Sequence, residues 1–456
     1  MSAAVPPRPP SVERLVAAAG AAVAGRDRAA VVAVAREIVA EERARLRAGA
    51  PAARPIEALA AALEGRLADL EGPADGGRVV NASGVVLHTN LGRAPWAAPA
   101  IRAAVAAAGG YSFLELDPAS GRRGRRGSAV EEHLRALTGA EDALVATNGA
   151  AALALAVGLA GRGRVVVSRG ELVEIGGGVR IPEIVRRAGA RLVEVGTTNR
   201  TRPDDFAEPL AAGATLVLRV HPSNFTMSGF VEAAEPRAVA EIAHRHGALV
   251  VDDLGSGALL DTAAYGLPHE PMPGERLAAG ADLVLFSADK LLGGPQAGLI
   301  VGRADLVARL RKDPLARAVR PDKAILAALE ATLALYRAGR VGEIPVWRMI
   351  GTPLDALRGR ASALAARIGP PAGVVATEAT VGGGSLPGDT IPSAGVALAI
   401  DAPDRLAAAL RSGRPPVHAR VAGGELVLDL RTVDPADDEP LATAVAAALA
   451  TGGWRR

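Results

Sequence analysis

Short apolar segments alternate with helical stretches between Val79 and about Gly302, and this alternation constrains the fold more than any other feature of the chain. Six of the apolar segments have the length and composition of buried strands. They are Ala143–Thr147, Arg164–Ser168, Arg191–Val195, Thr215–Val220, Ala248–Asp253 and Asp282–Phe286. Such a pattern predicts an α/β protein with a parallel or mostly parallel sheet covered by helices on both faces.

The regions on either side of this pattern predict two further domains. Residues 1–72 indicate a helical N-terminal domain, with one helix opening at Ser11 and a second running from Ala30 to Leu46, before a linker at Glu71–Gly77. Residues 78–320 form the predicted large domain. Residues 321–456 predict a long helix near Lys323–Arg340 and a small α+β domain with strands at 396–400, 417–421 and 425–430.

Composition excludes several classes of site. The chain has no cysteine, which excludes disulfides, thiolate catalysis and Cys-based metal centres, and its seven scattered histidines predict no metal site. The formal net charge is only +3, so any binding of nucleic acid needs a local basic patch. Leu15–Gly25 resembles a signal-peptide core, but charged helical sequence follows it, and no stretch is long enough to span a bilayer. We expect a cytoplasmic protein with no membrane partner.

Lysine is rare in this chain. Only Lys290, Lys312 and Lys323 occur among 52 Lys and Arg residues. A lysine kept where arginine otherwise supplies the charge suggests a task that a guanidinium cannot perform, such as forming an imine. Lys290 follows a buried strand and precedes the tight turn Gly293-Gly294-Pro295, whereas Lys312 and Lys323 resemble surface or helix-start charges. Lys290 is therefore the candidate catalytic amine, although a surface lysine in a loop is the simpler alternative.

Two other strand ends carry residues that suit the same chemistry. One strand runs through Thr147-Asn148-Gly149-Ala150-Ala151 straight into a helix, where small residues and free N–H groups suit a phosphate, or where Asn148 simply caps the helix. Another ends in Asp252-Asp253, a pair that needs a cation such as magnesium or a pyridinium nitrogen. Together with Lys290, these residues supply the imine lysine, ring-nitrogen acid and phosphate cup required by pyridoxal 5'-phosphate (PLP).

Arginines form a further constellation. Arg93 follows the segment beginning at Asn81, four arginines lie in Gly121–Gly127, and Arg317 and Arg320 follow the lysine strand. Guanidinium groups suit phosphate-like oxyanions, but most arginines in so arginine-rich a chain must be solvated at the surface. The glycine-flanked group of four is the stronger candidate, because a mobile loop has little structural reason to be so basic.

Taken together, these segments resemble the bacterial selenocysteine synthase family, the L-seryl-tRNA(Sec) selenium transferases, which are fold-type-I PLP enzymes. The resemblance covers nearly the whole chain, including the first helices, which resemble that family's tRNA-binding domain. Departures include Phe113 where the family has a small polar residue, Thr147 and Gly149 in an Asn-rich run, and Ala288 for a glycine. The segments that carry the resemblance are 81–93, 110–117, 168–177, 194–200, 253–257, 283–298 and 382–388.

The resemblance implies a mostly parallel seven-stranded sheet and a defined set of site residues. Lys290 would hold PLP as an imine and Asp253 would keep the ring nitrogen protonated, while the anionic selenium donor would meet three arginines. The remaining cofactor contacts are weaker; for Ser223-Asn224 a plain strand-end turn explains the residues equally well. His221 fits a satisfied strand-end histidine better than a cofactor neighbour. The full predicted set is Lys290, Arg93, Arg317 and Arg320 as catalytic residues, with Asp253, Asn148, Gly149, Ala150, Ala151, Ser287, Ser223 and Asn224 as cofactor contacts.

The implied reaction takes Ser-tRNA(Sec) and selenophosphate to selenocysteinyl-tRNA(Sec) through a PLP-bound aminoacrylyl group. The resemblance also implies a homo-oligomer, a pentamer of dimers, in which some arginines serve a neighbouring subunit. Two alternatives remain open at this point: a related PLP-dependent lyase or aldolase acting on a small amino acid or amino sugar acid, and a tRNA-binding scaffold without catalysis.

Overall fold

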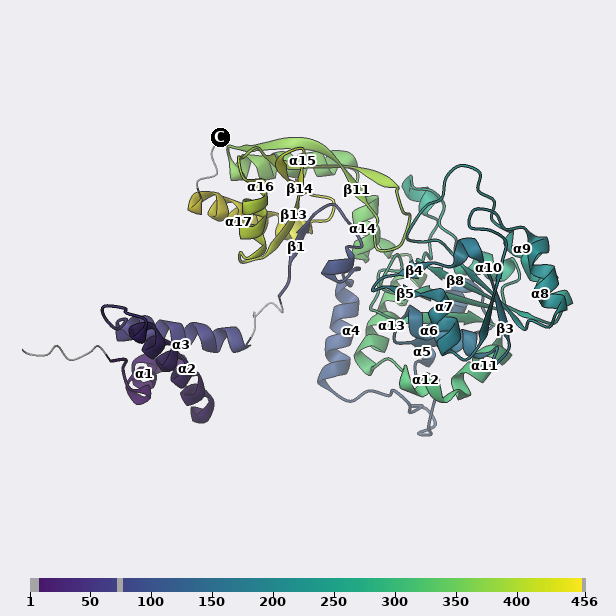
Figure 1. The fold of residues 1–456 in the computed structure, drawn as a ribbon, viewed down its shortest axis with the longest axis horizontal. Coiled ribbons are helices and arrows are strands. Elements are labelled where there is room, and N and C mark those ends of the chain that lie inside the picture. Colours follow the sequence, from purple (N-terminus) through teal and green to yellow (C-terminus); the bar gives the residue numbers. More distant parts are fainter. Residues whose placement is uncertain (1–7, 72–76, 453–456) are drawn as a thin grey trace, which may run out of the picture. The chain divides into compact units, whose positions relative to one another are not determined.

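The computed structural model describes residues 8–71 and 77–452 and divides the chain into two compact units, Met1–Val79 and Val80–Arg456 (Figure 1). The first unit is helical. Its three α-helices pack around a core that includes Leu15, Val31 and Leu59. These helices are α1 (Val12–Ala19), α2 (Arg28–Arg47) and α3 (Ile56–Glu71).

Local capping explains where the first two helices begin. The Ser11 hydroxyl accepts a hydrogen bond from the Arg14 amide, and the Asp27 carboxylate accepts one from the Ala30 amide, at 3.3 Å and 2.9 Å. Side chains of this kind satisfy amides that have no partner in the first turn. The second helix thus starts two residues before the predicted Ala30.

The second unit is built on a seven-stranded sheet with the strand order β2-β10-β9-β8-β7-β3-β6. All neighbours pair in parallel except β10, which is antiparallel to both β2 and β9. The predicted mostly parallel seven-stranded sheet is therefore confirmed. In sheet order the strands are Asp142–Ala146, Gly298–Gly302, Leu283–Ser287, Leu249–Gly255, Leu216–Val220, Arg164–Ser168 and Arg191–Val195.

Both faces of this sheet are buried. Along β9, Val284 and Phe286 belong to one apolar cluster while Leu283 and Leu285 belong to another on the opposite face. Successive strand residues point to opposite faces, so a continuous apolar run is what a doubly covered sheet requires. The helices of this layer structure are α4 (Ala98–Gly109), α5 (Ser128–Thr138), α6 (Gly149–Gly158), α7 (Ile181–Arg187), α8 (Ala207–Ala211), α9 (Pro236–Arg245), α10 (Pro273–Ala278), α11 (Ala304–Lys312), α12 (Pro314–Ala318), α13 (Lys323–Arg337) and α14 (Pro345–Gly351).

A five-stranded sheet with the order β1-β13-β14-β12-β11 forms the C-terminal part of the same unit. Its core includes Val396, Leu428 and Leu406. The strands are β1 (Val80–Ala82), β11 (Ala372–Thr380), β12 (Thr390–Leu398), β13 (Val417–Ala422) and β14 (Glu425–Asp429), with helices α15 (Leu354–Ile368), α16 (Pro403–Arg411) and α17 (Asp438–Thr451). A separate two-stranded ribbon joins β4 (Glu174–Ile175) and β5 (Val179–Arg180).

Two features of these sheets differ from the expectations. The sequence pattern places residues 80–82 with the large domain, but β1 pairs in parallel with β13, and Val80 and Ala82 are buried in the C-terminal core. Strands β10 and β11 were not predicted. In β11 most residues are exposed or half-buried along an alanine-rich edge, so it lacks the apolar run that marks a central strand.

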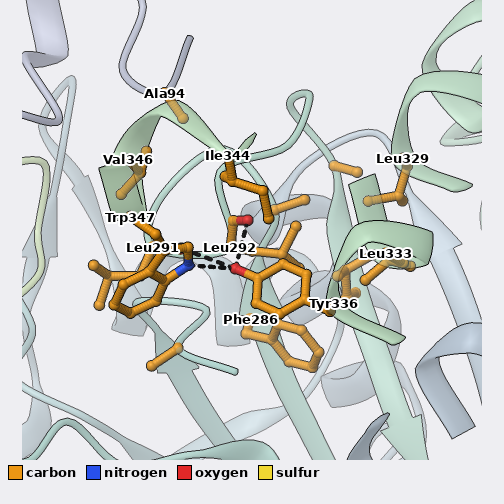
Figure 2. Close-up of a cluster of buried hydrophobic side chains, with 14 of the residues drawn as sticks. Ala94, Phe286, Leu291, Leu292, Leu329, Leu333, Tyr336, Ile344, Val346 and Trp347 are labelled. Carbon is orange, nitrogen blue, oxygen red and sulfur yellow. Dashed lines mark hydrogen bonds between the residues drawn. The ribbon is translucent and has the colours of Figure 1, made fainter. Parts of the chain in front are cut away.

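A cluster of buried side chains lies behind the loop that follows β9 (Figure 2). Leu291 and Leu292, directly after Lys290, pack in the same apolar cluster as Tyr336 of α13 and Trp347 of α14. The loop carrying the candidate lysine is therefore part of the protein core rather than a surface segment.

Within the described ranges, no helix combines the length and apolar character needed to cross a bilayer.

Candidate functional site

A cavity of about 470 Å³ lies at the carboxyl ends of the central strands and is lined by the side chain of Lys290. Most of the predicted site residues line it with Lys290. In the part of the chain that the structure describes, the predicted Ala151, Arg317 and Arg320 are not among the lining residues. The predicted residues that do line the cavity are Arg93, Asn148, Gly149, Ala150, Ser223, Asn224, Asp253, Ser287 and Lys290.

Two glycines make room for the Lys290 amine. A Cβ placed on Gly255 would lie 3.4 Å from Lys290 Nζ, and one placed on Gly384 would lie 3.2 Å from it. Both glycines also have positive φ, +67° and +77°, which disfavours other residues. Gly384 belongs to the glycine-rich segment 382–388, so its role here is to let the backbone approach the amine.

The surroundings of Lys290 favour its neutral form. Burial lowers the pKa of the Lys290 amine, and the positive charge of Arg93 lowers it further, while Asp253 acts in the opposite direction. A lowered pKa leaves more of the amine unprotonated at neutral pH. The unprotonated amine is the form that attacks a carbonyl.

The two neighbouring aspartates of β8, Asp252 and Asp253, face different cavities. Asp253 lines the Lys290 cavity, whereas Asp252 lines a different cavity and lies 3.7 Å from Arg276 Nε. Alternation along a strand explains the separation. A register shift between Asp253 and Gly255, where β8 pairs with β9, ends the regular strand at this point. Of the two predicted candidates, Asp253 is the one that faces the lysine.

Nearby positive charge offsets only part of the cost of burying an ionised Asp253 carboxylate. Burial raises the pKa of Asp253 to about 6; the charge of Lys290 lowers it, the nearby Asp252 raises it, and the Gly255 amide and His221 act to lower it. A cation bound in the cavity beside Asp253 would stabilise its ionised form. The ring nitrogen of a protonated pyridine is such a cation.

The helix α6 begins at the edge of the cavity. Asn148 is its N-cap, with its side chain accepting a hydrogen bond from the Ala151 amide at 2.9 Å. The first amides of a helix have no intrahelical acceptor, so those of Gly149 and Ala150 are suited to an anion. A Cβ on Gly149 would lie 2.9 Å from Ser287 Oγ, so glycine keeps that approach open. The predicted Ala151 instead serves the cap.

Arg93 is held in the cavity by an ion pair with the residue that precedes the lysine. Its Nη1 lies 2.6 Å from Asp289 Oδ2, and the Ala94 amide donates to the Asp289 carbonyl at 3.3 Å. Arg93 also has a φ of +64°, an unusual value for a residue with a side chain. The ion pair therefore ties Arg93 to the loop that carries Lys290.

The other predicted arginines lie elsewhere. Arg320 lines a smaller cavity of about 200 Å³ and is 3.5 Å from Glu115 Oε1. Glu115 also binds Arg123 at 2.6 Å and Arg126 at 3.2 Å. Arg317 is exposed. Arg125 of the basic loop pairs with Glu131 at 2.6 Å, so three of the four arginines of this loop are committed to ion pairs within the chain.

Several residues of the Lys290 cavity were not predicted as site residues. Gly383 and Gly384 come from a segment far along the chain, Gln296 comes from the turn after Lys290, and His221 was judged a structural histidine. His221 Nε2 lies 3.4 Å from the buried Glu270 Oε1. The run of glycines at 382–384 was the one sequence signal for this wall. Among residues 8–71 and 77–452, no group of three or more His, Asp or Glu is arranged to hold a metal ion.

The cavity fits PLP on three grounds. Its edge is a helix N-terminus with an N-cap asparagine, its floor is an undercompensated Asp253, and its amine is shielded between two glycines. These are the phosphate, ring-nitrogen and carbonyl partners that the cofactor needs.

Comparison with known proteins agrees with this chemistry. Residues 79–434 match the family described as SelA, L-seryl-tRNA selenium transferase. The chain is 44% identical over 437 residues to the L-seryl-tRNA(Sec) selenium transferase of Rhizobium meliloti (strain 1021), covering 92% of this chain and 93% of that protein. It is 47% identical over 365 residues to that of Hyphomonas neptunium (strain ATCC 15444), covering 78% of each.

Among solved structures, D-glucosaminate-6-phosphate ammonia-lyase is similar in fold, with a TM-score of 0.59 at 21% identity, over 82% of this chain and 96% of that one. The predicted fold-type-I PLP-enzyme fold is confirmed. With matches of this length and identity, the chain belongs to the L-seryl-tRNA selenium transferase family.

Proposed function

We propose that this protein is a PLP-dependent L-seryl-tRNA(Sec) selenium transferase, which converts Ser-tRNA(Sec) and selenophosphate to selenocysteinyl-tRNA(Sec). The observation that carries the proposal is the meeting of Lys290, Asp253 and the N-terminus of α6 in one cavity of a chain from this family. The overall exchange replaces the seryl hydroxyl at Cβ with selenium and releases phosphate from the donor. We also propose a cytoplasmic location.

The residues of the cavity would divide the cofactor between them. Lys290 would bind its carbonyl carbon, Asp253 its ring nitrogen, and the Asn148–Ala151 turn its phosphate, with Ser287, Ser223 and Asn224 alongside. When bound, PLP withdraws electrons from the Cα of an attached amino acid.

Proton transfer falls to Lys290. Its lowered pKa leaves more of the amine unprotonated at neutral pH, and the unprotonated amine could take the proton from Cα of the seryl group. Arg93, held by Asp289, supplies positive charge close by for the oxygens of selenophosphate. Asp253 has the opposite task, which is to remain ionised beside a cation.

Arg317 and Arg320 would join the donor site from a second copy of the chain. Both lie outside the Lys290 cavity of their own subunit. The segment that precedes the basic loop leaves Tyr111 and Phe113 strongly exposed, at 108% and 68%, as expected for a surface covered by another subunit. We therefore propose a homo-oligomer, a homodecamer by family resemblance, with arginines shared between subunits.

The N-terminal unit would bind the tRNA through one face of α2. Arg36, Arg43 and Arg47 are exposed, have no ion-pair partner among the described residues, and are spaced by seven and four residues, so they share one helix face. By contrast, Glu42 is fully buried and pairs with Arg45 and Arg54. A row of free guanidinium groups suits a phosphate backbone.

The proposed activity predicts a specific product. Incubation of the purified protein with PLP, Ser-tRNA(Sec) and selenophosphate should yield selenocysteinyl-tRNA(Sec), detected after deacylation by mass spectrometry. Omitting selenophosphate is the control. The proposal would be contradicted if the protein has normal PLP absorbance and gives no selenocysteinyl-tRNA(Sec), but eliminates ammonia from a small amino acid or cleaves it.

The pKa of Asp253 predicts a pH-dependent stability of the protein without cofactor. The folded pKa of about 6 exceeds the ordinary 3.8, so folding favours the protonated acid, and stability falls as pH rises between these values. Asp253→Asn should therefore be more stable than wild type above pH 6, by at most about 3 kcal/mol in the free energy of unfolding, which raises its Tm, and should have an equal Tm below pH 4. Thermal unfolding of both PLP-free proteins from about pH 3 to pH 8 tests this; with PLP, the order should reverse.

The arginine face predicts a salt-dependent loss of tRNA binding. Replacing Arg36, Arg43 and Arg47 with alanine should weaken tRNA binding at least about tenfold and lower the slope of log K against log salt by roughly two to three. Arg186, Arg245 and Arg309 are exposed arginines on helices of the other unit and give a control variant with the same change in charge. Equal losses in the two triple variants would contradict a specific face.

A further inference from the structure

The turn that follows Lys290 buries polar backbone groups. Leu291 and Leu292 are both 0% exposed, so their carbonyls lie in the apolar core rather than in water. A buried carbonyl without a partner is costly. The turn can keep this conformation only if a donor from another element reaches it.

Tyr336 is that donor. Its hydroxyl lies 2.8 Å from the Leu292 carbonyl and 3.4 Å from that of Leu291, and the Trp347 indole nitrogen lies 2.6 Å from the same hydroxyl (Figure 2). The indole N–H can only donate, so Tyr336 accepts from Trp347 and its own proton is directed at the loop carbonyls. The direction of the whole chain of hydrogen bonds is thereby fixed.

Other contacts leave the turn little freedom. The Leu291 amide donates to the Ser256 carbonyl at 3.0 Å, and the Gly293 amide donates to the Lys290 carbonyl at 2.9 Å. A Cβ on Gly293 would lie 2.3 Å from Ile344 Cγ2, so α14 and the residue before it press directly on the turn. The turn that carries Lys290 is therefore held between the residue after β8 on one side and α13 and α14 on the other.

We propose that Tyr336, oriented by Trp347, is a positioning residue for Lys290: its hydroxyl fixes the backbone of the 290–293 turn and so fixes where the lysine amine meets the cofactor. The inference rests on the proposed function, in which Lys290 carries PLP. Tyr336 itself lies in α13 and is not among the residues that line the Lys290 cavity, so it acts through the turn.

The hydrogen bonds that Tyr336 donates to the turn do not change with pH in the neutral range. Burial raises the pKa of the Tyr336 phenol well above its usual range, so the hydroxyl keeps its proton and remains a donor at neutral pH. A change in cofactor behaviour with pH therefore reports on groups in the cavity, not on ionisation of Tyr336.

Three variants separate positioning from plain stability. Tyr336→Phe removes the hydroxyl and leaves both the Leu292 carbonyl and the Trp347 indole without a partner. Tyr265→Phe removes the same atom from a ring that lies 5.0 Å from the Trp347 ring. The Tyr265 hydroxyl makes no described hydrogen bond to the turn. Trp347→Phe opens space in the core but keeps the bond from Tyr336 to Leu292.

The measurements are the Tm of each PLP-loaded protein and the rate at which bound PLP is lost on dilution, followed by its visible absorbance. Tyr336→Phe should lose PLP about five- to tenfold faster than wild type, the equivalent of one buried hydrogen bond. Tyr265→Phe should stay within about twofold of wild type. Trp347→Phe should have a Tm equal to or lower than that of Tyr336→Phe. It should nevertheless release PLP more slowly than Tyr336→Phe.

The inference is overturned if Tyr336→Phe releases PLP within about twofold of the wild-type rate, or if release rates simply follow Tm across the three variants. Failure of the proposed function looks different. In that case wild-type protein itself would bind no PLP, or Lys290→Ala would leave the visible absorbance unchanged.

Discussion

The rest of the site depends on the burial of two opposite charges at the end of a central sheet. Lys290 and Asp253 are both half-buried in the cavity, and each is pushed toward its neutral form by that burial. Their mutual attraction offsets only part of the cost. The cavity is therefore poised for a ligand that takes the amine into a covalent bond and gives the carboxylate a cation, which is what PLP does.

Holding such a pair in place requires a rigid frame. The strands β8 and β9 are buried on both faces and end at the same edge of the sheet; Asp253 lies near the end of β8, and the lysine turn follows β9. Glycines at 255 and 384 admit the amine, and the turn is fixed by the hydrogen bond that Tyr336 donates to it and by the one that it donates to the Ser256 carbonyl. Rigid placement of this kind keeps the reacting groups in register, and it explains why residues remote from the cavity contribute to the site.

The sequence predicted the parts of this arrangement that depend on local pattern. The strands β3 and β6 have the predicted bounds, and Lys290, Asp253 and Asn148 meet in one cavity as their strand-end positions indicated. Features set by distant contacts were not predictable in the same way. No local sequence pattern indicates that β1 pairs with β13, that Gly384 borders the Lys290 amine, or that Tyr336 donates a hydrogen bond to the lysine turn. The resemblance to the family predicted Arg320 as a site residue, but within one chain it pairs with Glu115 instead.

The proposed site depends on Lys290 being the amine that binds PLP. Borohydride reduction of the PLP-loaded protein, followed by digestion and mass spectrometry, tests it directly, because reduction makes the lysine–cofactor bond permanent. We expect a phosphopyridoxyl group on the peptide that contains Lys290 and none on those with Lys312 or Lys323. Labelling of Lys312 or Lys323, or unlabelled Lys290 in a protein that retains bound PLP, would contradict it.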